Sequence, residues 1–597
     1  MHPRGCKASI KAKEQKMKDK VNNFINGAAI LSAAGIIVKI LGAIFRIPLS
    51  SIIGSEGMGL YQLAYPLYSF LLVISSAGFP VAISRLVAQA VNRGDYKLAE
   101  RTFKLSRKLM FTLGLIATVI MLLLSDFVSK QQGNPDSKFA LLAIAPAILF
   151  VSVLASYRGY FQGMQNMVPT AISQIIEQFI KLVAGLGFAA FFVQYGVKWG
   201  AAGAVAGVTL SELIALFFIV LRYRKAQPQL SADISAMSTP TSDVTSKAII
   251  KDVLVIAVPV AIGSAIMPLV SLIDQLIVIN GLKTVIPFVS GLPFSIESFA
   301  EFAAESGVTI DTALSMTQVS AQYPELYEEF ITSLATSLYG IMSGNCSPIT
   351  ALPLIFSMSL AISIVPAISK FNALKNEKSV HETTSTSLRL TALIAFPCAI
   401  GICVLAEPII RVLYSRLDAW EIHFAVNCLR ILSMTVLVLP LIQSATAVLQ
   451  GLGKQNIPVI NLAIGAILIK IPLTYFLVQQ PALNIFGAAT SSVSIYAFAA
   501  IADIACVKYY TKVKLAPIST FVKPLVSAIL MGVIAFVVYT LLYKVTQSLI
   551  ISMGLAVIAG VLVYFAMVFI TKMIKKTDLE YIPKGELILK KFSRFFD

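Results

Sequence analysis

The chain has 597 residues, of which 57% are hydrophobic and only 13% are charged, and its mean hydropathy is +0.81. A soluble protein carries about 25% charged residues, so this composition excludes a soluble chain. Six cysteines and three histidines, with no CxxC pair, predict neither a disulfide framework nor a metal site. The composition is that of a membrane protein without a bound cofactor.

Apolar runs long enough to cross a bilayer recur along the whole chain. A transmembrane helix needs roughly 20 largely apolar residues to span about 30 Å of hydrocarbon. Fourteen runs meet this condition, near residues 24–46, 60–84, 109–125, 139–157, 168–193, 200–221, 252–280, 350–369, 390–410, 422–449, 457–478, 485–507, 522–543 and 549–571. The first is too long for the core of a signal peptide, so we expect it to remain as the first helix. We predict an all-α polytopic membrane protein with about fourteen transmembrane helices.

The 48 lysines and arginines outnumber the 30 acids and give a net charge of +18. With the N-terminus in the cytoplasm, cytoplasmic segments hold 36 of these cations, the opposite side holds 7, and 5 lie within or at the ends of helices. This asymmetry is the positive-inside pattern of membrane proteins. It predicts a multi-pass protein of the cell membrane with both termini in the cytoplasm and anionic lipids at its cytoplasmic face. Nucleic acid is not needed to explain the charge.

An internal repeat is visible at an offset of 286 to 289 residues. Five pairs share this offset in the same order: Pro66 and Pro353, Pro80 and Pro366, Pro169 and Pro458, Lys181 and Lys470, and Gly200 and Gly487. Because six helices return the chain to the side where it entered, both copies cross the membrane in the same direction, as in one class of secondary transporters. We predict two homologous six-helix lobes followed by two C-terminal helices.

The repeat and the charge pattern together divide the chain into six predicted segments. They are a basic cytoplasmic segment (1–23), an N-lobe (24–221), a cytoplasmic linker (222–251), a C-lobe (252–507), two further helices (508–571) and a basic cytoplasmic tail (572–597). The C-lobe alone carries an acidic insertion, over about 283–345, on the external side.

Within this insertion, Glu297, Glu301 and Glu305 recur every four residues, which predicts one face of a short helix with phenylalanines nearby. A solvated face of an amphipathic helix is the simpler interpretation. A carboxylate cluster for a cation or an external partner is the alternative.

Ionisable residues inside the predicted helices are the candidates for function, because a charge in the bilayer is costly unless it is paired or lines a polar cavity. Lys39 and Arg46 are seven residues apart, two turns along one stripe of the first helix. Two stacked cations on a cavity wall could hold a phosphate or diphosphate. The alternative is that Arg46 reaches the membrane interface and only Lys39 is deep. Arg85, at the cytoplasmic end of the second helix, is a weaker candidate because it can serve as a topology anchor.

Further charges lie deeper in the chain. Glu177 and Lys181 are four residues apart, acid first, which favours a salt bridge within one helix; the alternative is a proton- or cation-coupled switch. Lys470, the repeat mate of Lys181, has no acid four residues before it, needs a partner elsewhere, and is therefore the better candidate for a substrate cavity. Asp274 and Glu212 are lone acids, and either could bind the coupling ion.

The stretch RGYFQGMQNMVPTAISQIIEQFIKL, which begins at Arg158, and the N-terminal stretch KILGAIFRIPLSSIIGSEGMGLYQLAYPLYSF resemble the polysaccharide-transporter branch of the MOP exporter superfamily. That branch includes proteins like stage V sporulation protein B and is related to MurJ-type lipid II flippases. The resemblance implies export of an undecaprenyl-diphosphate-linked saccharide for the cell wall or the spore cortex. It also implies that Lys39 and Arg46 line a central cavity. An arginine expected at the end of the second helix has no clear counterpart here.

These features together predict a transporter or flippase that works by alternating access, and not an enzyme. No GxxxxGK[ST] motif is present, so an ion gradient, the membrane potential or substrate metabolism would drive transport. The predicted partners are a lipid-linked oligosaccharide and cell-wall synthesis enzymes. A multidrug/cation antiporter of the MATE type is the first alternative, although it should present acids in the N-lobe cavity. A polytopic glycosyltransferase or polymerase is the second, and its only candidate carboxylates lie in the insertion.

Overall fold

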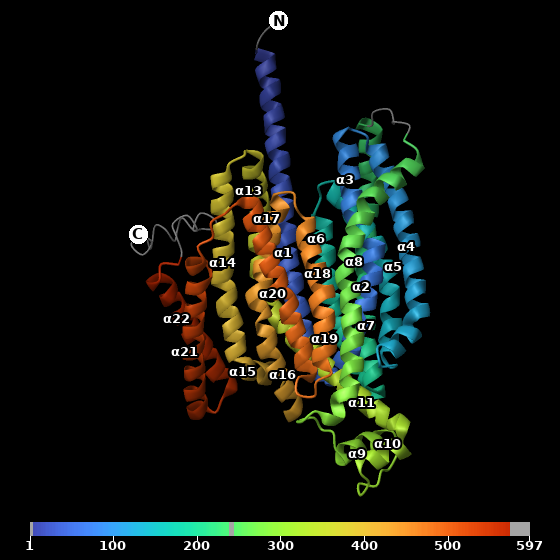
Figure 1. Ribbon diagram of the computed structural model, residues 1–597. Helices are drawn as coiled ribbons and strands as arrows, with labels where there is room; N and C mark the ends of the chain where they lie inside the picture. The colour runs from blue at the N-terminus through green and yellow to red at the C-terminus, as the bar shows by residue number, and fades with distance from the viewer. Residues whose placement is uncertain (1–3, 238–243, 574–597) are drawn as a thin grey trace. The chain divides into compact units, whose positions relative to one another are not determined.

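The structure is a computed structural model that describes residues 4–237 and 244–573 (Figure 1). The described part of the chain is helical and contains no β-strand. Thirteen segments within it are long and apolar enough to cross a membrane. The first, Ala33–Asn92, contains most of the first predicted run and all of the second, and the other twelve correspond to the remaining predicted runs. The predicted fold class is therefore confirmed.

The chain forms two compact units. Unit 1 comprises Met1–Ile52, Leu63–Gln131 and Pro135–Leu272, and unit 2 comprises Ile53–Gln62, Gln132–Asn134 and Ile273–Asp597. The division falls inside one long helix, at Leu272. The domain limits inferred from the sequence stay a prediction.

Unit 1 is built from the long N-terminal helices. They are α1 (Arg4–Leu63, as far as Ile52), α2 (Tyr65–Ser76), α3 (Phe79–Asn92), α4 (Tyr96–Gln131), α5 (Ser137–Gly163), α6 (Val168–Phe192), α7 (Val197–Met237) and the first part of α8 (Ser246–Val285). Glycines bring these helices close together, as is usual where lipid gives no hydrophobic drive for helix association. A Cβ on Gly207 of α7 would lie 2.3 Å from the Cα of Gly185 in α6, so the two backbones touch there.

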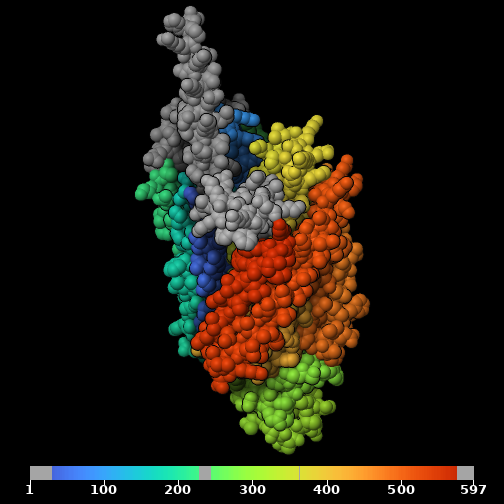
Figure 2. All heavy atoms as spheres, turned by 90° about the vertical axis from the view of Figure 1, so that its left-hand side faces the viewer, coloured from blue at the N-terminus to red at the C-terminus, as the bar shows by residue number. Residues whose placement is uncertain are grey.

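Unit 2 contains the remaining helices. They are α9 (Ile296–Glu305), α10 (Met316–Gln322), α11 (Pro324–Gly340), α12 (Ser347–Ala351), α13 (Leu354–Ala373), α14 (Glu377–Val404), α15 (Ala406–Leu413), α16 (Ala419–Ser433), α17 (Thr435–Gly451), α18 (Asn456–Gly465), α19 (Ile471–Val478), α20 (Asn484–Thr511), α21 (Lys523–Thr546) and α22 (Leu549–Ile570). The two C-terminal helices pack on α14, where Tyr564 donates a hydrogen bond to the carbonyl oxygen of Leu393 at 2.8 Å. Figure 2 shows α21 and α22 along one face of unit 2.

The acidic insertion forms α9, α10 and α11, at the end of unit 2 near the start of α16 (Figures 1 and 2). The helix predicted from the spacing of three glutamates is α9, and the Ser295 hydroxyl caps it by accepting a hydrogen bond from the Ser298 N–H at 3.3 Å. Phe299 is fully buried, and its ring centroid lies 5.6 Å from that of Phe330 in α11. Among the described residues, no group of three His, Cys, Asp or Glu side chains could hold a metal ion. The insertion is thus a small helical layer with an aromatic core.

Residues Ile53–Gln62 of α1 pack into unit 2, and this segment contains a kink at Gly54, whose φ of +70° favours glycine. A Cβ on Gly59 would lie 2.2 Å from the carbonyl oxygen of Thr336, so this segment touches the backbone of α11. The Ser55 hydroxyl donates to the Glu421 carboxylate at the start of α16. The end of the predicted insertion is therefore part of the packed core of unit 2.

The contact between α6 and α7 predicts a large effect of one added methyl group. In Gly207→Ala, the new Cβ meets backbone that cannot move aside, and overpacking of this kind costs typically 1–3 kcal/mol. We expect a melting temperature several degrees below that of the wild type, measured by thermal unfolding in detergent. Gly187→Ala on α6 is the matched control, because no atom lies within 4 Å of its added Cβ. Equal melting temperatures for the two variants would contradict this account of the packing.

Candidate functional site

A buried ion pair in unit 2 joins two of the candidate residues. The Lys470 ammonium lies 3.1 Å from the Asp274 carboxylate, and the two side chains are only 14% and 12% exposed. The hydroxyl of Thr474 donates to the other oxygen of Asp274 at 2.9 Å, and it is itself 2.7 Å from the Ser491 hydroxyl. Lys470 also donates to Ser492 at 3.3 Å. Helices α8, α19 and α20 thus converge on one polar cluster inside the membrane-spanning part.

The local backbone helps to place Lys470. Residues Ala466–Lys470 form a π-helical turn between α18 and α19, and Pro472 is the second residue after it. A proline lacks the N–H that a regular helix would use at this point, and π-turns of this type occur often at functional sites. The partner that the sequence left open for Lys470 is therefore Asp274. Asp274 itself is not the lone acid that it seems to be in the sequence.

A second charged cluster lies in unit 1. The Arg158 guanidinium of α5 lies 2.9 Å from the Glu177 carboxylate of α6 and donates to the Ser173 hydroxyl at 3.0 Å. The predicted salt bridge between Glu177 and Lys181 is therefore wrong, because Glu177 turns towards α5, where a guanidinium can satisfy it. The sequence offers Arg158 only as the first residue of the RGYFQG stretch, and the fold shows that it reaches α6.

Lys181 points instead at two aromatic rings. Its ammonium lies 5.3 Å from the ring centre of Phe45 in α1 and 5.7 Å from that of Tyr65 in α2. Both distances are in the range of cation–π attraction. Glu212 of α7 is 7% exposed and interacts electrostatically with Glu177, Arg158 and Lys181. One of its carboxylate oxygens has no hydrogen-bond partner among the described residues. Glu212, Glu177 and Lys181 thus lie close to one another in unit 1.

The repeat relates the two clusters position by position. Lys181 and Lys470 are 289 residues apart, and so are Gly185 and Thr474, one turn further along. A Cβ on Gly185 would lie 2.8 Å from the Phe45 ring, so glycine makes room for that ring beside Lys181. In the second half, the threonine at the same place binds a carboxylate. Equivalent half-buried lysines are therefore compensated by aromatic rings in one half and by an anion in the other. Thr474 could have been found in the sequence from this offset and from its spacing of four from Lys470.

The predicted cation stripe lies on α1 in unit 1. Lys39 is exposed and Arg46 is half-buried. Gly42, between them, faces α6, because a Cβ there would lie 3.7 Å from the side-chain oxygen of Gln178. Lys181 contacts the ring of Phe45, the residue before Arg46. Lys181 is therefore a third cation beside the part of α1 that carries Lys39 and Arg46. Arg85 is exposed on α3, and none of the described contacts joins it to the other candidates.

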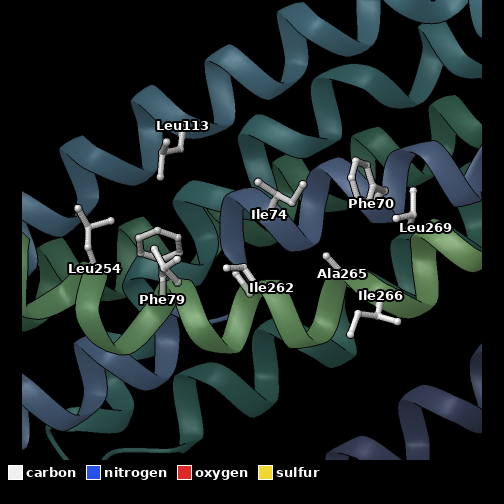
Figure 3. A pocket seen from close by; sticks show the side chains of 11 residues that line it. Phe70, Ile74, Phe79, Leu113, Leu254, Ile262, Ala265, Ile266 and Leu269 are labelled. Atoms are coloured by element: carbon white, nitrogen blue, oxygen red, sulfur yellow. The ribbon is translucent and has the colours of Figure 1, made fainter. Parts of the chain in front are cut away.

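Apolar cavities are found in both units. In unit 1, a cavity of about 470 Å³ lies between α2, α3, α4 and α8, and Ile74, Phe79, Leu113 and Ile262 point into it (Figure 3). In unit 2, a cavity of about 720 Å³ lies between α13, α14, α15, α21 and α22. The lining of the second includes Leu393, Met531 and Tyr564 and is almost entirely apolar.

Comparison with known proteins places the chain in a family. Residues 24–284 match the family model for a polysaccharide biosynthesis protein, and residues 342–476 match the MatE model. Stage V sporulation protein B of Bacillus subtilis (strain 168) is 26% identical over 95% of this chain and 99% of its own length. Lipid II flippase MurJ of the same organism is 23% identical over 76% of this chain and 77% of its own length.

Solved structures agree with these matches. A lipid II flippase MurJ in an inward closed conformation superposes with a TM-score of 0.61 over 91% of this chain and 98% of its own, at 15% identity. An inward-facing multidrug resistance MATE family transporter of the MOP superfamily gives 0.58 over 80% and 94%, also at 15% identity. The chain belongs to the MOP exporter superfamily. It is a multi-pass membrane transporter of that superfamily, and its relatives with an assigned activity are flippases and transporters, not enzymes.

The ion pair predicts strong coupling between two substitutions. Asp274→Asn or Lys470→Met alone leaves a buried charge without its partner, which costs roughly 3–5 kcal/mol. The double variant removes both charges, so we expect its melting temperature in detergent to lie closer to the wild type than that of either single variant. Lys181→Met is the matched control, because Lys181 lies against the rings of Phe45 and Tyr65 and no carboxylate of the described residues lies within salt-bridge distance of it. Additive effects of the Asp274 and Lys470 substitutions would contradict the pairing.

Proposed function

We propose that this transporter flips an undecaprenyl-diphosphate-linked saccharide, a peptidoglycan or other cell-wall polysaccharide precursor, across the cell membrane by alternating access. The name of the MurJ relative supports a lipid-linked substrate, and the name of the sporulation relative supports a role in sporulation, for which we propose synthesis of the spore cortex or the cell wall. The polysaccharide biosynthesis match over 24–284 agrees with this class. Cell-wall synthesis enzymes would be its partners, and the charge asymmetry supports cytoplasmic termini.

The observation that carries the proposal is the set of cations inside unit 1. Lys39 and Arg46 lie two turns apart on α1, and Lys181 is held beside α1 by aromatic rings instead of a carboxylate. A lysine compensated in this way keeps its donors available for an incoming anion. A diphosphate offers several oxygens to such a group of ammonium and guanidinium donors. The cations are therefore suited to the head group of the substrate.

The tail of the substrate needs an apolar path. The cavity of about 720 Å³ beside α14, α21 and α22 is lined almost entirely by apolar side chains and is suited to part of a prenyl chain. The two helices beyond the six-helix repeat would then have a role of their own, because they complete the wall of this cavity.

Coupling to an ion would involve the buried acids. Asp274 is neutralised by Lys470 only while both are charged, so a proton on Asp274, or an anion drawn to Lys470, would open the pair. Glu212, with one oxygen that has no partner among the described residues, is the corresponding candidate in unit 1. Either would link the charge state of a lobe to its conformation.

A MATE-type multidrug/cation antiporter is the second candidate function. The MatE match over 342–476 and the buried carboxylate of Glu212 favour it. The two proposals differ in the expected effect of neutralising charges. An antiporter for cations would lose activity with Glu212→Gln and keep it with Lys39→Ala and Arg46→Ala.

A flipping assay in reconstituted vesicles tests the main proposal. The vesicles contain a fluorescent undecaprenyl-diphosphate-linked saccharide, and its transfer between leaflets is measured. We expect Lys39→Ala with Arg46→Ala to lower the initial rate at least roughly tenfold, because each lost charge-assisted contact is worth about 1.5–3 kcal/mol. Lys247→Ala with Lys251→Ala is the control, since it removes two exposed cations from the start of α8.

Unchanged flipping by the Lys39 and Arg46 double variant would overturn the assignment of the head-group site. Depletion of the protein in cells gives an independent readout of the substrate. The proposal requires a lipid-linked precursor to accumulate on the cytoplasmic leaflet, and the identity of that precursor would name the glycan.

A further inference from the structure

A separate cationic pocket lies on the outside of unit 1, between α4 and α5. It has a volume of about 480 Å³ and is lined by Arg107, Lys108, Phe111, Thr112, Val153 and Tyr157. None of these residues belongs to the transport site described above. The pocket combines two adjacent cations with apolar side chains and hydroxyl groups.

Its position along α4 is set by the length and composition of that helix. At about 1.5 Å per residue, its 36 residues span about 54 Å, far more than the ~30 Å of hydrocarbon. The charged residues all lie near its two ends, and Arg107 and Lys108 are the last before a run of apolar residues over 109–125. They therefore lie at the level where the head groups of the lipids meet the hydrocarbon.

Arg107 is held in a fixed orientation. Its guanidinium donates a hydrogen bond to the Tyr157 hydroxyl oxygen at 3.0 Å. The guanidinium carbon lies 5.6 Å from the ring centre of Phe103 and 5.9 Å from that of Tyr157. Both rings are buried in an aromatic cluster with Tyr160 and Tyr223. This support removes much of the conformational entropy that a free arginine would lose on binding an anion.

Among the residues that the structure describes, no carboxylate neutralises the charges of the pocket. Lys104, one turn before Lys108, lies 2.7 Å from Glu100. Among the described residues, by contrast, no carboxylate lies within salt-bridge distance of Arg107 or Lys108. The Tyr157 hydroxyl accepts from Arg107, so its own proton is available to an acceptor oxygen. Two cations and a hydroxyl donor thus face a space that no anion of the described part of the chain fills.

We propose that this pocket binds the phosphate of an anionic phospholipid of the surrounding membrane, with an acyl chain against Phe111 and Val153. The guanidinium supplies a forked pair of donors to the phosphate oxygens, and Lys108 adds a point charge. Phe111 is 48% exposed beside the cations, so its ring lies where the first methylene groups of such a lipid would pass. The site is independent of the substrate proposed above.

Tryptophan fluorescence with brominated lipids tests this proposal in the full-length protein. The chain has two tryptophans, so the reporter is Phe111→Trp in a Trp199→Phe, Trp420→Phe background. The protein is reconstituted in phosphatidylcholine vesicles with a small fraction of brominated phosphatidylglycerol or brominated phosphatidylcholine. We expect the quenching to show that brominated phosphatidylglycerol binds at least roughly fivefold more strongly than brominated phosphatidylcholine. This is the effect of one cation near an anionic surface.

Matched variants distinguish specific binding of the anionic lipid in this pocket from unspecific charge attraction. Arg107→Ala with Lys108→Ala should abolish the preference, and Lys247→Ala with Lys251→Ala, which removes the same charge elsewhere, should keep it. Tyr157→Phe keeps the ring and removes the hydroxyl, so it should reduce the preference while the protein stays folded by size-exclusion chromatography. Equal losses in the two double variants would overturn the proposal in favour of unspecific charge attraction. Loss of the preference on addition of inorganic phosphate would also overturn it, because the occupant would then be a soluble anion.

Discussion

The need to compensate a charged group inside the membrane governs the core of both units. An ammonium in a low-dielectric environment must find an anion, a ring or water, because the energy of leaving it alone is large. Lys470 is compensated by Asp274 with help from Thr474, and Lys181 by the rings of Phe45 and Tyr65. The residue four positions after each lysine matches the group that compensates the lysine. Gly185 leaves space for a ring, whereas Thr474 at the same repeat position supplies a hydroxyl to a carboxylate.

The two halves therefore place a lysine at the same repeat position but surround it with different groups. In an alternating-access cycle, one repeat rocks against the other around a fixed site near the bilayer midplane. A lysine among rings is open to an anionic ligand, and a lysine in a salt bridge must first lose its partner. In the proposed transport cycle, the two halves would therefore have different parts.

A similar fold is found in a lipid II flippase and in a multidrug transporter. The fold thus does not decide the substrate, and the functional argument depends on particular side chains. In this chain the candidate side chains are Lys39, Arg46 and Lys181 on one hand and the buried acids Glu212 and Asp274 on the other. The acidic insertion adds a layer with its own aromatic core, in which the burial of Phe299 leaves the glutamates of α9 at the surface.

The sequence by itself determined the fold class, the number and place of the apolar helices, and the repeat. These features depend on composition and periodicity, which act locally and are strong when the solvent is a bilayer. It also singled out every residue of the two charged clusters except Arg158 and the hydroxyl groups. Only the tertiary structure decided which charges pair. Glu177 meets Arg158 and not Lys181, and Asp274 meets a lysine about two hundred positions away, because a salt bridge between helices depends on their packing and rotation, which spacing along one helix does not contain.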